Sequence, residues 1–272
     1  MKLHGHLIKI NMKIFDCFKF FNELELLELR FMELYDTVDY FVLVEANKTH
    51  TGKPKNYVFE DNKEKFKQYL DKVIHVKIDD MPSYSEQDIW TAENFQRNCI
   101  MRGLVDYAKN GDKIIVSDID EIPNTDIIKS NLDNPNWVTF RQKLYYYYVN
   151  CEQNCHWDGP IMANYGTFNL PQHLRNAARG GFNNQSNGGW HYSFMGGPER
   201  VRLKVESIAE SHYIINEVGS VSEIKEKMES QTDLWNREDD YAKKKIVDIT
   251  NNKPKMMDKF LEKYPDFYFN SK

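Results

Sequence analysis

A regular alternation of short apolar runs with helical segments constrains the fold of this chain more than any other feature. The apolar runs cover residues 13–18, 40–44, 73–78 and 113–117. Between them, residues 22–35 carry apolar side chains at helical spacing, and residues 87–108 have helical character before Asn110 and Gly111 stop it. Strands that alternate with helices predict right-handed crossovers. The expected class is therefore α/β, with a Rossmann-type, mostly parallel sheet flanked by helices.

Further local predictions concern the first helix and the second half of the chain. Asn22 is followed by Glu25 three residues later, which predicts a capping box. Residues 137–150 resemble a long aromatic strand, and the Gly- and Asn-rich sequence up to about residue 200 is expected to be irregular. Helices are expected at residues 222–230, 239–246 and 256–263. No linker or repeat separates independent units, so residues 1–272 are expected to form one domain.

Charge, cysteine content and hydropathy exclude several classes of function. A net charge of -5 gives no general attraction to nucleic acid, which is therefore not an expected partner. Four cysteines are too few for a disulfide scaffold, and we expect reduced thiols. The start of the sequence, MKLHGHLIKINMKIF, lacks the apolar core of an export signal, and no run approaches the roughly 18 apolar residues of a membrane span. The expectation is a cytoplasmic protein without a membrane span.

Three carboxylates follow the fourth apolar run within four positions, in the stretch IIVSDIDEIPN. These are Asp118, Asp120 and Glu121. They repel one another and lose hydration on burial, so the arrangement is costly unless a cation is present. Residues two apart in extended backbone project the same way, so Asp118 and Asp120 can share one ion. Oxygen ligands favour magnesium or manganese, which bridges the phosphates of a nucleotide diphosphate. The alternative is a solvated loop with helix-capping acids.

Motifs around this cluster resemble glycosyltransferase family 17. They are SDIDEIP itself, FNELELLELRFMELYDTVDYFVLVEANKTHTGKPK upstream and GGWHYSFMGG downstream, and the resemblance covers roughly residues 13–215. The resemblance implies a GT-A-like, metal-dependent and inverting glycosyltransferase. It implies that residues 13–125 bind the nucleotide sugar and that residues 126–272 form the acceptor side. It also implies UDP-N-acetylglucosamine as the donor, a glycan hydroxyl as the acceptor, and Mn²⁺ or Mg²⁺ as the cofactor.

The motif GGWHYSF supplies two further candidates. In enzymes of the GT-A type a late histidine is often a metal ligand, which the resemblance assigns here to His191 beside Asp118 and Asp120. The alternative is a core histidine bonded to a backbone carbonyl. Trp190 either stacks on a sugar ring of the donor or fills the core.

Inversion requires a general base that takes the proton of the acceptor hydroxyl. The carboxylate candidates are Glu121, Asp158, Glu206 and Glu210. A cation lowers the proton affinity of a carboxylate, so a metal ligand is a poor base. We therefore favour Glu210, with Asp158 second, over the acids of the cluster.

Donor binding is predicted at two further positions. Glu45 ends the second apolar run, where an acid can bind the ribose or uracil, or else form a salt bridge. Arg97 can bind the diphosphate with its guanidinium fork, or pair with Glu93 four residues earlier. Asp118 is expected to contribute to donor binding as well as to the metal site.

Two other functions remain open at this point. A glycoside hydrolase also uses paired acids and aromatic side chains, but its two carboxyls lie about 5 to 10 Å apart across the scissile bond rather than in a tight cluster. A non-catalytic carbohydrate-binding protein of the same fold would bind sugar without consuming a nucleotide sugar. Metal dependence separates the transferase from the hydrolase, and turnover separates it from the binding protein.

Overall fold

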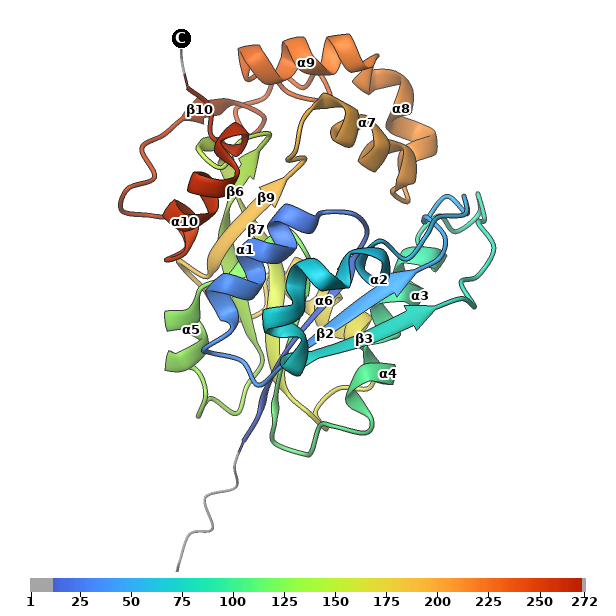
Figure 1. The fold of residues 1–272 in the computed structure, drawn as a ribbon, viewed down its shortest axis with the longest axis vertical. Helices are drawn as coiled ribbons and strands as arrows, with labels where there is room; N and C mark the ends of the chain where they lie inside the picture. Colours follow the sequence, from blue (N-terminus) through green and yellow to red (C-terminus); the bar gives the residue numbers. More distant parts are fainter. Residues whose placement is uncertain (1–11, 271–272) are drawn as a thin grey trace, which may run out of the picture.

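The computed structural model describes residues 12–270, built around one ten-stranded sheet (Figure 1). Its main path runs β3-β2-β1-β4-β7-β6-β9-β5. The first four strands in chain order are β1 (Ile14–Phe20), β2 (Tyr40–Ala46), β3 (Val73–Ile78) and β4 (Lys113–Asp118). They pair in parallel in the order 3-2-1-4, which is the Rossmann arrangement. The predicted α/β class and all four predicted strands are confirmed.

The second half of the chain extends this sheet with strands of mixed direction. Its strands are β5 (Glu121–Pro123), β6 (Val138–Tyr146), β7 (Cys151–Asn164), β8 (Asn184–Gln185), β9 (Gly189–Ser193) and β10 (Lys244–Ile246). Strand β7 runs antiparallel between β4 and β6, and β9 runs parallel to β6. Because only β5 and β7 oppose the common direction, the sheet as a whole is mostly parallel, as predicted.

Two predictions for this half are wrong. The stretch expected to be irregular up to residue 200 contains β7, the helix α6 (Pro171–Arg179) and β9. Buried and partly exposed residues are mixed along β7, so it shows neither an apolar run nor a clear alternation. Residues 239–246 were expected to be helical, but their end forms β10, which pairs with β7 at the sheet edge.

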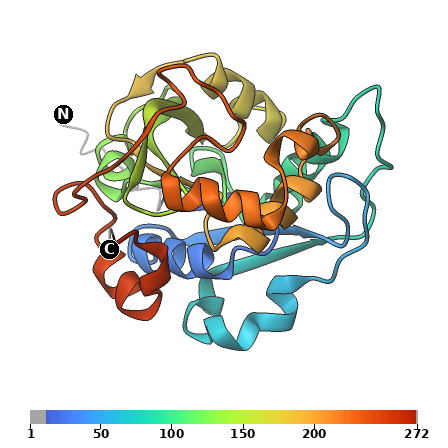
Figure 2. The same cartoon turned by 90° about the horizontal axis from the view of Figure 1, so that it is seen from above.

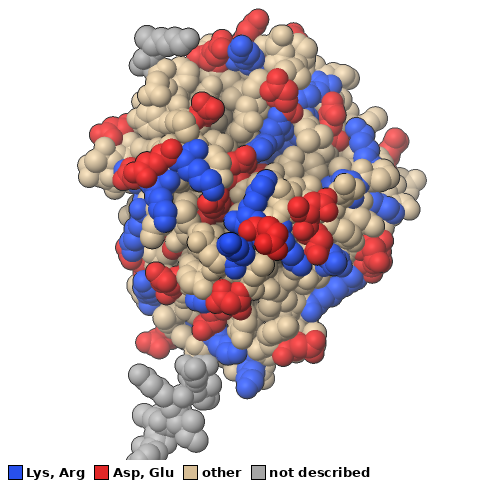
Figure 3. Space-filling model, viewed as in Figure 1, with Lys and Arg blue, Asp and Glu red and all other residues tan. Residues whose placement is uncertain are grey.

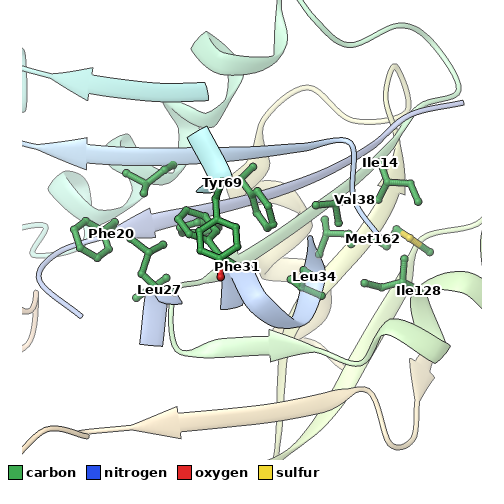
Figure 4. Close-up of a cluster of buried hydrophobic side chains, with 14 of the residues drawn as sticks. Ile14, Phe20, Leu27, Phe31, Leu34, Val38, Tyr69, Ile128 and Met162 are labelled. Carbon is green, nitrogen blue, oxygen red and sulfur yellow. The ribbon is translucent and has the colours of Figure 1, made fainter. Parts of the chain in front are cut away.

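Helices cover both faces of the sheet. Those of the first half are α1 (Leu24–Leu34), α2 (Val58–Asn62), the 3-10 helix η1 (Lys63–Lys72), α3 (Thr91–Asn98), α4 (Ile100–Leu104) and α5 (Thr125–Ser130). One buried cluster joins α1 to the sheet, and Figure 4 shows Phe31 of α1 packed beside Tyr69 within it. A second cluster joins the opposite face to α3, α4 and α6. This two-sided cover explains why β1 and β2 are almost fully buried.

The predicted capping box at the start of α1 is wrong. The N-cap residue is Glu23, and its side chain makes no cap hydrogen bond to the helix. Instead the Glu23 carboxylate accepts hydrogen bonds from the backbone N–H groups of Phe21 and Asn22. Glu25 is drawn away from the helix start by an ion pair with Arg200.

Three C-terminal helices lie together above the carboxyl ends of the parallel strands (Figures 1 and 2). They are α7 (Pro198–Ser207), α8 (Ser211–Val218) and α9 (Val221–Ser230), and a buried cluster joins them to β6. The chain ends with α10 (Met257–Lys263) and the 3-10 helix η2 (Pro265–Phe267), which pack against β6 and β9. All four cysteines are unpaired, as expected. Among residues 12–270 no helix has the length and apolar character to cross a membrane, and the sequence start lies outside this range.

Candidate active site

A cavity of about 650 Å³ opens where the parallel strands β1, β2 and β4 end. The walls come from the turn after β4, the loop after β2, α3, α6, β7 and the segment joining α7 to α8. Ligands of open α/β sheets bind at this position. Figure 3 shows acidic and basic side chains intermixed over the face of the molecule seen in Figure 1, without a large region of one sign.

The side chain of Arg30 on α1 binds the turn after β4. This side chain is fully buried and forms a two-point ion pair with Asp16, at 2.6 and 2.7 Å. Its guanidinium also donates to the backbone carbonyls of Asp118, Ile119 and Glu121, at 2.9 to 3.2 Å. We call residues 118–121 the acidic turn. Because Arg30 binds its carbonyls, the backbone of the acidic turn is fixed in one path.

Asp118, at the end of β4, is surrounded by basic side chains. Its carboxylate lies 3.0 Å from Arg175 of α6, and 3.3 Å from both Lys19 and Arg97. Burial alone would raise the pKa of Asp118, but these three positive charges hold it well below its usual range. Asp118 is therefore ionised, and both of its oxygens are already engaged by the protein's own cations.

Glu121 lies behind Asp118 and does not line the pocket. Its carboxylate is fully buried and receives two hydrogen bonds from Arg175, at 2.7 and 2.8 Å. Trp157 of β7 donates its indole N–H to the same carboxylate, and the backbone N–H of Asp118 donates at 2.8 Å. This environment suits an acid that orients Arg175 and Trp157. It leaves Glu121 without access to an acceptor hydroxyl.

Asp120 projects to a different place from Asp118, because β4 ends at Asp118 and the chain then turns. One Asp120 oxygen accepts from the ammonium of Lys204 of α7 at 2.7 Å, and the other lies 3.6 Å from Nε2 of His191. Burial favours the neutral acid, but Lys204 and His191 outweigh it and lower the pKa of Asp120. The Nδ1 atom of His191 is buried and has no hydrogen-bond partner among the described residues.

Asp120 and His191 have the chemistry of ligands for a divalent ion. Among residues 12–270, no three His, Cys, Asp or Glu side chains come close enough together to hold a metal ion. Asp120 and His191 nevertheless offer a carboxylate oxygen without a hydrogen bond and a partly unsatisfied imidazole. Mg²⁺ and similar ions are commonly held by one or two protein ligands plus waters and substrate phosphates. Asp120 and His191 fit that kind of site, whereas both oxygens of Asp118 are paired with basic side chains.

Glu210 is the acidic side chain of the pocket that differs most from the others. It lines the pocket just before α8 and forms no ion pair with any described residue. Burial raises the pKa of Glu210, and the nearby charge of Glu93 adds to the effect. Glu93 itself is paired with Lys19 and Arg97, each at 2.7 Å. Glu210 is thus the pocket carboxylate whose surroundings best suit proton transfer.

Several predicted residues are not brought to the pocket. Asp158 forms a two-point pair with Arg141, at 2.9 Å, and lies outside the pocket lining. Glu45 is fully buried outside the lining, where it accepts from the N–H of Phe59 and lies near His75 and Lys55. Trp190 packs in the cluster formed with α10, and its indole N–H donates to Asn252. Glu206 pairs with Arg202 on α7 and also lies outside the lining.

Arg97 does line the pocket, and it pairs with both Glu93 and Asp118. The sequence predictions missed its basic neighbours Arg175, Arg179 and Lys204, as well as Trp157. Arg175 and Arg179 are spaced one helical turn apart on α6, a signal that the irregular assignment of this segment concealed. The Arg179 guanidinium lies 3.9 Å over the Trp157 ring, whose centroid is 4.6 Å from that of His191.

Comparison with known proteins finds a matching family and several similar proteins. The model of the family described as Glycosyltransferase family 17 matches residues 1–257. Over 110 residues, 39% of this chain, the chain is 36% identical to the human beta-1,4-mannosyl-glycoprotein 4-beta-N-acetylglucosaminyltransferase and 34% identical to the mouse protein of that name. It spans only 21% of the human relative and 20% of the mouse one.

One solved structure is also similar. It is a putative nucleotide-diphospho-sugar transferase from Desulfovibrio desulfuricans G20, with a TM-score of 0.35 and 9% sequence identity. The alignment covers 79% of this chain and 94% of that chain. The likeness is weak, and the family match together with the pocket geometry carries the functional argument.

Proposed function

The chain belongs to glycosyltransferase family 17, and from this premise we propose that it transfers a sugar from a nucleotide sugar to a hydroxyl of a glycan. The proposed donor is UDP-N-acetylglucosamine, because the relatives with the matching segment are named as N-acetylglucosaminyltransferases. Membership of this family favours transfer over the glycoside hydrolase and the non-catalytic binding protein.

The observation that carries the proposal is the contrast between Glu210 and three other acids that line the same pocket. Asp118, Asp120 and Glu93 are held ionised by basic side chains, whereas Glu210 has no such partner and a raised pKa. In the proposed step Glu210 takes the proton of the acceptor hydroxyl while that oxygen attacks the anomeric carbon. The bond from this carbon to the diphosphate oxygen breaks, and its electron pair leaves with UDP. Attack opposite the leaving group inverts the anomeric configuration.

A divalent ion, Mn²⁺ or Mg²⁺, belongs to the proposal as cofactor. When bound, such an ion supplies charge stabilisation to the departing diphosphate. Asp120 and His191 would hold it, and the ammonium of Lys204 keeps Asp120 ionised. Arg97 and Asp118 line the donor part of the pocket, with Arg97 proposed to contact the diphosphate.

The test is release of UDP from UDP-N-acetylglucosamine by the purified protein in Mn²⁺ with a panel of glycans. Glu210→Gln is expected to lower kcat by about 10² to 10⁴, the usual contribution of a general base. Glu206→Gln is the matched control, because Glu206 lies four residues earlier but outside the pocket lining. A Glu210→Gln variant as active as the Glu206→Gln variant would remove Glu210 from the reaction. Absence of UDP release by the parent protein with every glycan of the panel would refute the proposed activity.

A further inference from the structure

We propose that Trp90 is the platform on which a pyranose ring of the acceptor stacks, on the Glu210 side of the pocket. The inference rests on the proposed function and adds the position and chemistry of the acceptor site. Trp90 precedes α3, and 42% of its surface is exposed although it lines the pocket. Because it lines the pocket and is partly exposed, Trp90 offers an aromatic face to a ligand bound there.

The ring of Trp90 is free, whereas its backbone is fixed. No aromatic or cationic side chain of the described residues stacks on it. Asp88 accepts hydrogen bonds from the backbone N–H of Trp90 at 3.2 Å and from the hydroxyl of Thr91 at 2.8 Å. These two hydrogen bonds hold the turn that precedes α3, and with it the backbone of Trp90. The other tryptophan of the pocket, Trp157, already has Arg179 over its ring.

Trp90 lies directly before α3, and the contacts of this helix relate it to Glu210. Trp90, Glu93, Asn94 and Arg97 recur at helical spacing and all line the pocket. Glu93 lies 3.9 Å from the ring of His50, whose backbone N–H donates to the carbonyl of Ser207 at 3.1 Å. Ser207 ends α7, three residues before Glu210. His50 thus contacts both α3, which follows Trp90, and the end of α7, which leads to Glu210.

The same helix separates the acceptor from the donor phosphates. Arg97 is seven residues after Trp90, which corresponds to about 10 Å along the helix axis. A diphosphate at Arg97 leaves room in that interval for the donor sugar, with the acceptor ring beyond it at Trp90. Asp88 and Asn94 line the same pocket and provide polar groups for the hydroxyls of a bound sugar.

The direct test uses fluorine NMR of protein labelled with 5-fluorotryptophan, which gives one signal for each of the five tryptophans. The Trp90 signal is assigned by its loss in Trp90→Phe. Methyl β-glycosides of N-acetylglucosamine, mannose, galactose and glucose are titrated, and UDP is titrated separately. The Trp90 signal is expected to shift with at least one glycoside and not with UDP. No shift with any glycoside, or a shift with UDP, would overturn the proposal.

Kinetics give a second readout. Trp90→Ala is expected to raise the acceptor KM roughly tenfold, the scale of one lost stacking contact, while the Kd for UDP stays within about twofold. Tyr241→Ala is the control, because Tyr241 is 71% exposed and lies outside the pocket lining. A weakened UDP affinity in Trp90→Ala would place Trp90 at the donor and contradict the inference. If the parent protein consumes no donor, the proposed function fails, but the NMR titration still decides whether Trp90 binds sugar.

Discussion

At the residue scale, Glu210 is held in a state that costs stability and suits catalysis. Its carboxylate is half-buried, has no ion pair among the described residues, and has a raised pKa. A base in this environment binds a proton more readily than Asp118 or Asp120, whose partners keep them ionised. Because burial disfavours the ionised form of Glu210, its carboxylate accepts a proton readily, which suits a general base.

This cost predicts a pH-dependent effect on stability. The pKa of Glu210 in the folded protein lies above the ordinary 4.5, so the folded state binds the proton more tightly than the unfolded state. The free energy of unfolding therefore falls as the pH rises from about 4.5 through the folded-state pKa. Glu210→Gln should raise the melting temperature at pH 7 and have little effect near pH 4. Thermal melts at both pH values measure this, with Glu206→Gln as the control. An equal gain at both pH values would show that charge is not the cause.

Arg30 predicts a second effect at this scale. Arg30→Met leaves Asp16 buried without its partner and frees three carbonyls of the acidic turn, so we expect a loss of about 3 to 5 kcal/mol in the free energy of unfolding. Arg102→Met breaks an ion pair of similar geometry with Asp80, but one that is about half exposed. That control should lose at most about 1 kcal/mol. Urea denaturation of both variants makes the comparison, and similar losses would contradict the buried clamp.

At the element scale, strand alternation decides which of two neighbouring residues reaches the pocket. His191 and Trp190 are adjacent on β9, so their side chains point to opposite faces. His191 faces Asp120, and Trp190 therefore packs toward α10. In the same way Trp157 of β7 lines the pocket while Asp158 does not. Predicting both Trp190 and His191 as site residues conflicts with extended backbone, and the sequence already contained that restriction.

The contact between α7 and the acidic turn predicts a competition for Asp120. Lys204 neutralises one oxygen of this carboxylate and lies 3.7 Å from Glu23. A divalent ion at Asp120 would be repelled by the ammonium, so Lys204→Met should bind Mn²⁺ at least roughly tenfold more tightly in the absence of donor. Electron paramagnetic resonance of free Mn²⁺ measures this, and Lys225→Met on α9 serves as the control. An unchanged or weaker affinity would place the ion elsewhere.

The close approach of β5 and β9 predicts an effect of glycine replacement. Gly189 has φ +134, and a Cβ there would collide with the backbone carbonyl of Ile122. Gly111 also has a positive φ, +95, but a Cβ there would meet nothing within 4 Å. Gly111→Ala should therefore cost about 1 kcal/mol of backbone strain, and Gly189→Ala should cost more. Denaturation curves of the two variants measure the loss in the free energy of unfolding. Equal losses would argue against a close approach of Gly189 to Ile122.

At the scale of the whole molecule, the sequence predicted the parallel strands, the acidic turn and Arg97, but not the other basic side chains around the turn. The strands are marked by continuous apolar runs because both sheet faces are covered. The cations come from β1, α3, α6 and α7, and they are Lys19, Arg97, Arg175 and Lys204. Each of these cations is distant in sequence from the carboxylate of the acidic turn that it contacts, so no local spacing reveals these pairs. Glu210 was favoured as the base from the sequence, and its role stays a prediction.

The central claim is that the pocket at the carboxyl ends of β1, β2 and β4 holds the donor diphosphate beside Asp120 and His191. A crystal structure with UDP-N-acetylglucosamine and Mn²⁺, with the ion located by its anomalous scattering, measures this most directly. We predict a manganese peak within bonding distance of Asp120 and His191, with the diphosphate in the same pocket and Glu210 facing the donor sugar. A manganese peak elsewhere, with the nucleotide outside the pocket and Lys204 still bound to Asp120, would contradict it.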